Sequence, residues 1–190
     1  HADMFVLNIS SPNTPGLRDL HGQEYLESIL KSCNEIRSKK GADKPYLLKL
    51  SPDSLDGEIR STISVAQGLG IDGIVATNTT IKRPIPLSTQ SRKAFSSDGG
   101  LSGRPLQSRA LEVINAAYDE TNGKIPIVGV GGIDSKDSAW EAIISGASLL
   151  QLYSALVFNG PTVVSSIVKG LKRRVRESGV SSISEAVGNK

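Results

Sequence analysis

Five short apolar runs, each followed by a polar or glycine-rich cluster, constrain the fold more than any other feature of this sequence. Each run is rich in β-branched residues and has the length of a buried strand. The segments between the runs have helical periodicity, which is the pattern of repeated βα units around a parallel sheet. The sequence therefore predicts an α/β fold. The expected strands are residues 5–9, 46–50, 73–77, 125–130 and 148–152.

The segments between the expected strands, and the segment after the last strand, carry apolar stripes with the spacing of one helix face. Cys33 lies in the first stripe, so we interpret it as a packed core thiol rather than a nucleophile. Lys172, Arg173 and Arg176 fall on the outer face of the last helix, where water and the helix dipole favour them. The stripes consist of Leu26, Ile29, Leu30, Cys33 and Ile36; Ile59, Ile63 and Ala66; Leu106, Ala110, Val113, Ile114 and Ala117; and Val164, Ile167, Val168, Leu171 and Val175.

Two architectures fit this alternation: a doubly wound sheet, and a (β/α)8 TIM barrel of which the chain supplies a part. Every expected strand ends in polar or glycine residues. A barrel collects its chemistry from the carboxyl ends of many strands, whereas an open sheet concentrates it at one switch point. The barrel is therefore favoured. Because closure needs eight strands, we expect about three βα units before residue 1, which makes the five runs strands 4–8.

The composition excludes several classes of protein. The 190 residues, of which 38% are hydrophobic and 22% charged, are typical of one globular domain. The net charge of +3 is small, and the sequence has no basic stripe interleaved with aromatic residues, which argues against nucleic-acid binding. A single cysteine rules out an internal disulfide framework and a metal site of several thiolates. No apolar run in the sequence is long enough to span a bilayer.

Glycines at the ends of the last two expected strands predict a phosphate site. Gly131 and Gly132 have no side chain that would keep an anion from their backbone amides. The following strand ends at Tyr153 and Ser154, and barrels frequently seat a phosphate between the loops after strands 7 and 8. Gly103 is placed to add another amide to the same anion. The alternative is that these glycines only form tight turns.

Polar side chains at the other strand ends predict a ligand that carries amide and acidic groups. Lys49 lies within an apolar strand, where its ammonium needs an anion or an electron-rich ring, unless it extends to water at the strand end. Uncharged donors and acceptors suit such a ligand, although residues of these types also cap local turns. They are Asn8, Asn13, Asn78 and Thr79.

Ser11 lies in a loop shaped by two prolines and a glycine, which we expect to cover the mouth of the barrel. Neither His1 nor His21 belongs to a motif, and Gly-x-Ser-x-Gly is absent from the sequence. An acyl-enzyme mechanism of the hydrolase kind is therefore not expected.

The motifs at these strand ends resemble those of the dihydroorotate dehydrogenases, in the same order and at compatible spacing over essentially the whole chain. Any one of them is weak, but six in order are specific. They are Asn-Ile-Ser-Ser-Pro-Asn-Thr-Pro-Gly-Leu-Arg at 8–18, Leu-Lys-Leu-Ser-Pro-Asp at 48–53, Thr-Asn-Thr-Thr at 77–80, Gly-Gly-Leu-Ser-Gly-Arg-Pro-Leu at 99–106, Val-Gly-Val-Gly-Gly at 128–132 and Gln-Leu-Tyr-Ser at 151–154.

The resemblance implies an FMN cofactor across the carboxyl mouth of a barrel, with dihydroorotate stacked on the flavin. It implies that Ser11 takes a proton from C5 of the substrate while a hydride passes from C6 to the flavin, with Thr14 the nearest hydroxyl to assist. Lys49 and Thr77 would contact the flavin ring, and Asn8 would lie near both ring and substrate. The remaining roles go to Asn13, Asn78 and Thr79 for the substrate, and to Gly103, Gly131, Gly132, Tyr153 and Ser154 for the cofactor phosphate.

Ser11 also indicates a class within the resembled family. The soluble class carries cysteine at this place and the quinone-linked class carries serine, so the resemblance implies ubiquinone or another quinone as final electron acceptor. It further implies attachment to a membrane through an N-terminal region, at the mitochondrial inner membrane in a eukaryote or the cytoplasmic membrane in a bacterium. On this interpretation residues 1–190 are the C-terminal part of one FMN-binding barrel domain, and the preceding strands and membrane-associating region lie outside the sequence.

Two other functions remain open. One is a different phosphate-binding barrel enzyme, such as an isomerase or synthase that uses the glycine site for a substrate phosphate. The other is a non-catalytic remnant of a barrel. The presence of the serine, the lysine and the amides together at one end of the expected sheet favours the oxidoreductase.

Overall fold

The computed structural model of the chain describes residues 1–13, 22–40, 44–85, 88–96 and 98–190. Its centre is a parallel sheet of five strands in the order β1-β2-β3-β4-β5. The strands are β1 (Phe5–Leu7), β2 (Tyr46–Lys49), β3 (Gly73–Ala76), β4 (Ile127–Val130) and β5 (Leu149–Gln151). Strand order follows chain order throughout, as in a sheet that is wound in one direction, and the α/β prediction is confirmed.

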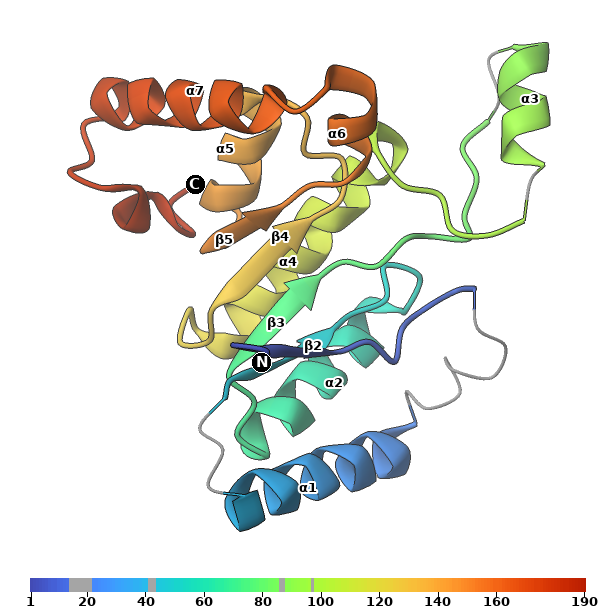
Figure 1. The fold of residues 1–190 in the computed structure, drawn as a ribbon, viewed down its shortest axis with the longest axis vertical. Coiled ribbons are helices and arrows are strands. Elements are labelled where there is room, and N and C mark those ends of the chain that lie inside the picture. The colour runs from blue at the N-terminus through green and yellow to red at the C-terminus, as the bar shows by residue number, and fades with distance from the viewer. Residues whose placement is uncertain (14–21, 41–43, 86–87, 97) are drawn as a thin grey trace.

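Helices alternate with these strands as the sequence predicts. The longer ones are α1 (Gln23–Lys40), α2 (Asp56–Gly68), α4 (Gln107–Thr121), α5 (Lys136–Ile144) and α7 (Val163–Ser178). The shorter ones are α3 (Thr89–Phe95) and α6 (Ser154–Asn159), with 3-10 turns η2 (Arg104–Leu106) and η3 (Ile183–Ala186). Helix α3 projects away from the sheet on the segment between β3 and η2 (Figure 1).

The two faces of the sheet differ in what covers them. Leu48, Ile74 and Ile127 point to one face and share a core with residues of α1, α2, α4 and α5. These helices lie in this order along one side of the sheet, each in contact with the next, and α7 packs on α5 (Figure 1). Leu47 and Val75 belong to a separate cluster with Val128 and Val130 that includes strand residues only. Helices on one face favour the barrel over the doubly wound sheet, which has helices on both faces.

The predicted strands are longer than the observed ones. Expected strands 5–9 and 46–50 stop at Leu7 and Lys49, and 125–130 begins only at Ile127. Beyond the last paired residue the chain leaves the sheet toward the polar loops, although single bonds continue the ladder: Leu50 N donates to Val75 O and Thr77 N to Val130 O. The error is therefore confined to the ends, where boundaries are hardest to place.

Three residues of the predicted helix stripes are exposed. Ile36, near the end of α1, is 58% exposed, and on α7 Val164 and Val168 are 47% and 44% exposed. Helix α7 buries the predicted Ile167 together with Val163, which the stripe omits, because it packs on α5 and α6 along a narrower face than the stripe predicts. The other predicted stripes are buried or partly buried, and Cys33 packs at the edge of the main core. Burial raises the pKa of the Cys33 thiol, in line with its interpretation as a packed residue.

None of the helices that the structure describes is long and apolar enough to cross a bilayer.

Candidate active site

A cavity of about 800 Å³ opens at the carboxyl ends of the strands and brings together most of the predicted site residues. It is lined from β2 by Lys49, from the segment after β3 by Thr77, Asn78 and Thr79, from the segment before η2 by Gly103, from the end of β4 by Gly131 and Gly132, and from the end of β5 by Tyr153 and Ser154. Residues from four strand ends thus share one rim. Asn8, Ser11 and Asn13, which follow β1, do not line this cavity.

The glycine corner of the cavity depends on close packing against η2 and α4. Gly132 has φ of +73°, and a Cβ there would lie 2.6 Å from Cβ and 2.9 Å from Cα of Gln107. Gly131 has φ of +131°, and a Cβ there would lie 2.9 Å from Cβ of Ala110. Both positions therefore require glycine, because a side chain would strain the backbone and collide with the helix. The close approach leaves backbone amides, rather than side chains, to form this corner.

Two hydroxyls complete the glycine corner. Gly103 has φ of +79°, and Ser102, directly before it, lies with its Oγ 2.7 Å from Oγ of Ser154. This contact joins the segment before η2 to the start of α6, which follow different strands. Small donors from both segments therefore face the space beside Gly131 and Gly132, an arrangement suited to the oxygens of a phosphate.

Lys49 enters the cavity from the last position of β2. Its side chain is half-buried, and burial lowers the pKa of its ammonium below the usual lysine value. Within the described residues the ammonium makes no hydrogen bond or ion pair, and burial is the one influence on its pKa. A desolvated cation aimed into a cavity is suited to an anion or to a ring that gains negative charge.

Asn78 links the end of β3 to the end of β1 across the intervening strand. Its side-chain nitrogen donates to Asn8 Oδ1 at 2.8 Å and to Ser10 Oγ at 3.1 Å, and its Oδ1 accepts from the backbone nitrogen of Thr79 at 2.9 Å. Asn8 is thereby joined to the cavity although it does not line it. Because Asn8 Oδ1 is engaged, its nitrogen remains as the donor that can face a ligand.

The segment after β1 meets the same rim through Asn13. Its Oδ1 accepts from the backbone nitrogen of Gly100 at 3.0 Å, and Gly100 lines the cavity. Ser11 Oγ accepts from the backbone nitrogen of Asn13 at 3.3 Å, which is a local turn. Ser11 therefore lies on the rim side of the sheet, in the segment that reaches the cavity through Asn13. Thr14, the expected helper, lies outside the described residues.

Two supports of the rim are not evident from sequence patterns. Asp53, after β2, accepts from the hydroxyl of Thr80 and, at 3.0 Å, from the backbone nitrogen of Ile81, so it fixes the segment that carries Thr79. Arg109 on α4 donates to the carbonyl oxygens of Pro52 and Ser54 at 2.8 and 2.9 Å. Asp53 ends one of the motifs that the sequence singles out and Arg109 closely follows another, but their partners are distant in the chain, so only the fold brings them together.

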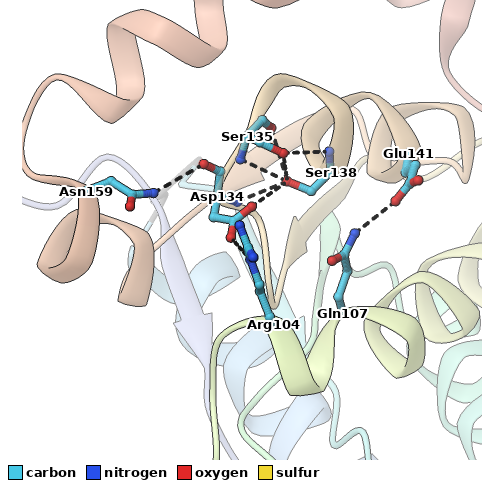
Figure 2. A network of polar contacts seen from close by, with 7 residues as sticks. All are labelled: Arg104, Gln107, Asp134, Ser135, Ser138, Glu141 and Asn159. Carbon is cyan, nitrogen blue, oxygen red and sulfur yellow. Dashed lines mark hydrogen bonds and ion pairs between the residues drawn. The ribbon is translucent and has the colours of Figure 1, made fainter.

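A further set of polar residues joins the loops around the glycine corner (Figure 2). It includes an ion pair between Arg104 and Asp134, both of which line the cavity. The described residues contain no group of His, Cys, Asp and Glu that could hold a metal ion. Besides this ion pair, the rim offers backbone amides, amide side chains, hydroxyls and a lysine, which is a donor set for an organic ligand that carries a phosphate.

Comparison with known proteins identifies relatives of nearly the whole chain. Residues 1–175 match the family model described as dihydroorotate dehydrogenase. A protein of Rippkaea orientalis named dihydroorotate dehydrogenase (quinone) is 46% identical over 98% of this chain and 50% of its own length. One of the same name from Streptomyces coelicolor is 43% identical over 99% of this chain and 52% of its own. The chain thus spans about half the length of the curated relatives it matches.

Solved structures agree with the sequence comparisons. The crystal structure of DHODH from Eimeria tenella in complex with ferulenol superposes on this chain with a TM-score of 0.91 at 32% identity. The superposition covers 99% of this chain and 54% of the Eimeria chain. The ligand-free type of the same protein gives a TM-score of 0.89 at 33% identity. From the family match over residues 1–175, supported by these structures, the chain belongs to the dihydroorotate dehydrogenase family.

Proposed function

We propose that this chain forms the catalytic rim of an enzyme that oxidises dihydroorotate to orotate with FMN as hydride acceptor and a quinone as final electron acceptor, in de novo pyrimidine biosynthesis. The observation that carries the proposal is the meeting of Lys49, the Asn78 amide and the glycine corner in one cavity. Relatives over 40% identical bear the name dihydroorotate dehydrogenase (quinone), which supports the same assignment.

The proposal includes a domain boundary: the chain supplies strands 4–8 of a single FMN-binding (β/α)8 barrel. In the part of the chain that the structure describes, helices pack on one face of the sheet, as in a barrel. Apolar side chains are exposed on the two edge strands, with Phe5 52% exposed on β1 and Leu149 57% exposed on β5. Further strands beside these edges would bury them and would close the sheet.

The donor set of the cavity fits FMN. Gly131 and Gly132 lie too close to α4 to carry a side chain, and Gly103 has φ of +79°, so all three present backbone at this corner, which suits a phosphate that binds main-chain amides. Ser154 would add a hydroxyl and Tyr153 a backbone amide. Lys49 and Thr77, which line the same cavity, would lie against the isoalloxazine ring. Bound there, the flavin would supply the hydride acceptor, and the Lys49 cation would stabilise negative charge on the reduced ring.

The amide residues would hold the substrate. Asn78 keeps Asn8 oriented so that the Asn8 nitrogen can donate to a carboxylate or carbonyl oxygen. Asn13 is fixed through its oxygen by Gly100 and presents its own nitrogen in the same way. Thr79 adds a hydroxyl to this set. Uncharged donors of this kind suit dihydroorotate, which carries a carboxylate and ring amides.

Ser11 would accept the proton that leaves C5 of dihydroorotate as the hydride leaves C6. A serine hydroxyl is a weak base, so it needs a route by which the proton moves on to water or to neighbouring hydroxyls. The turn that joins Ser11 to Asn13 would fix the distance between the base and the amide that holds the substrate. These two residues would therefore approach the substrate as one unit.

Serine, rather than cysteine, at position 11 supports the quinone-linked class. This class implies a membrane-associated protein, at the mitochondrial inner membrane in a eukaryote or the cytoplasmic membrane in a bacterium. We place the membrane contact and the quinone site outside residues 1–190, in the N-terminal region that the resemblance implies.

Anaerobic mixing with dihydroorotate tests the proposed function. The protein expressed from its complete gene should purify yellow, and its flavin absorbance band should bleach with dihydroorotate and return when a quinone is added. Bleaching without return would keep the reaction and remove the quinone class. A colourless protein would favour another phosphate-binding barrel enzyme, and a yellow protein that dihydroorotate does not bleach would favour the non-catalytic alternative.

A further inference from the structure

One carboxylate lies beside the glycine corner. Among the described residues that line the cavity, Asp134 is the single acidic one, and it follows Gly131 and Gly132 by only a few positions. Its side chain is 17% exposed, so water screens its charge only in part. A negative charge at this place would repel a phosphate in the glycine corner.

Arg104 neutralises this carboxylate. Its Nε donates to Asp134 Oδ2 in an ion pair between the first residue of η2 and the loop after β4 (Figure 2). Arg104 directly follows Gly103, so the pair joins two of the segments that form the glycine corner. The Arg104 side chain is 79% exposed, whereas that of Asp134 is largely covered.

Asp134 itself is held from several sides, through its backbone as well as its carboxylate. Its backbone nitrogen donates to Ser138 Oγ at 3.0 Å at the start of α5, and its backbone oxygen accepts from Asn159 Nδ2 at 3.4 Å at the end of α6. With Arg104 it thus ties η2, the loop after β4 and α6 to one another (Figure 2). The carboxylate of this junction would repel an anion in the glycine corner, and the ion pair with Arg104 offsets that repulsion.

We propose that Arg104 is a positioning residue for the cofactor phosphate: it neutralises Asp134 and holds the Gly103 segment against the loop of Gly131 and Gly132, without itself binding the phosphate. This inference rests on the proposed function, because it takes the anion to be the phosphate of FMN. It separates two roles at the rim. Backbone amides contact the phosphate, and the ion pair beside them sets how strongly the corner prefers a doubly negative group.

A comparison of FMN with riboflavin isolates the effect on the phosphate. Riboflavin has the same ring and ribityl chain but no phosphate, so a general loss of structure weakens both ligands alike. In apoprotein prepared from the complete gene product, Arg104→Gln leaves Asp134 charged beside the phosphate. We expect the affinity for FMN, measured by quenching of flavin fluorescence, to fall about tenfold or more. The affinity for riboflavin should change less than about twofold.

The partner variants test the charge argument. Asp134→Asn should raise the ratio of FMN affinity to riboflavin affinity several-fold, because it removes the repulsive charge. The double variant Arg104→Gln with Asp134→Asn should recover most of the FMN affinity that Arg104→Gln loses. Arg104→Lys keeps the charge and should stay close to the wild type in this ratio. Arg173→Gln is the matched control, since Arg173 pairs with Glu177 on the exposed side of α7.

Each outcome decides between clear alternatives. An equal loss of FMN and riboflavin affinity in Arg104→Gln would make the pair merely structural, and an unchanged ratio would remove it from phosphate binding. A double variant as weak as Arg104→Gln alone would show that Arg104 binds the phosphate directly, which also overturns the proposal. Should Arg104→Gln fail to fold, a fall of the ratio in Asp134→Asn overturns it. A wild type that binds neither flavin would instead refute the proposed function.

Discussion

The side-chain nitrogen of Asn78 lies 2.8 Å from Oδ1 of Asn8, and this contact joins the carboxyl ends of β3 and β1 over the strand between them. Asn78 is buried, whereas Asn8 is exposed at the rim. The buried amide therefore determines which end of the exposed amide faces outward. Since Asn78 donates, Asn8 must turn its oxygen toward the sheet and its nitrogen toward a ligand.

Asn78→Asp should reverse the orientation of Asn8. A carboxylate at 78 accepts hydrogen bonds only, so Asn8 would turn its nitrogen inward and present an oxygen to the substrate carboxylate. We expect KM for dihydroorotate to rise about tenfold or more, with a smaller change in kcat, because an interaction with the bound substrate is lost. Steady-state kinetics checks this, and Asn115→Asp on α4, outside the cavity, serves as the control. A normal KM would show that Asn8 does not contact the substrate.

Ser11→Ala should leave FMN bound and slow the reduction of the flavin by dihydroorotate about 10²–10⁴-fold, the usual contribution of a general base. Ser11 does not line the cavity that holds the glycine corner, so its loss should not weaken the cofactor. Ser11→Cys should keep part of the rate, because a thiolate can take the same proton. Single-turnover mixing under anaerobic conditions measures both variants. Near-normal reduction in Ser11→Ala would exclude Ser11 from the mechanism.

Lys49→Met should stabilise the protein and impair its chemistry. Burial lowers the pKa of Lys49, so the folded state disfavours the charged form. This penalty is fully present below the lowered pKa, where lysine is charged in the folded and the unfolded state, and fades as pH rises toward the unfolded value. Because the side chain is only half-buried, water screens the effect, and we expect Tm at pH 7 to rise by about 1–3 °C.

Two measurements on Lys49→Met separate its effect on stability from its effect on activity: Tm as a function of pH, and the rate of flavin reduction. The gain in Tm from Lys49→Met should shrink as pH rises through the lowered pKa of Lys49 toward the usual lysine value, because the wild-type lysine then loses its charge. Reduction of the flavin should slow by about 10²-fold, since positive charge near the reduced ring is lost. Lys169→Met, on the exposed side of α7, is the control and should change neither quantity. A fall in Tm at pH 7 would show that Lys49 has a stabilising partner.

Strand content and most of the rim follow from local patterns in the sequence. The runs at 46–50 and 73–77 are apolar on both sides because one side packs on helices and the other forms the strand-only cluster, and this double burial is what makes them recognisable. Polar or glycine residues stand at the end of each run or just after it, because the chain leaves the sheet there, which is why Lys49, Asn78 and Gly132 could be predicted to share an edge.

Long-range polar contacts are what the sequence does not reveal. Arg104 and Asp134 lie 30 positions apart, and Asp53 and Thr80 lie 27 apart, so no periodicity relates them. The exposure of Val164 and Val168 has a similar origin, because it depends on how α7 packs on its neighbours rather than on the spacing of its own residues. Patterns within one element predict which residue types face the core, whereas partners across elements depend on the packing angle.

Gly132→Ala should reveal how closely the glycine corner is packed. The new methyl group would meet Gln107 at 2.6 Å and would occupy a backbone conformation with φ of +73°. Gly179→Ala separates the two effects, because Gly179 has nearly the same φ of +76° but nothing within 4 Å of the added carbon.

We expect Gly179→Ala to cost about 1 kcal/mol of unfolding free energy, from backbone strain alone. Gly132→Ala should cost about 1–3 kcal/mol more and should lose FMN, because the collision moves the loop away from α4. Denaturant unfolding measures the free energy of unfolding, and flavin titration measures the affinity for FMN. Equal effects of the two substitutions would show that a methyl group at position 132 does not collide with α4.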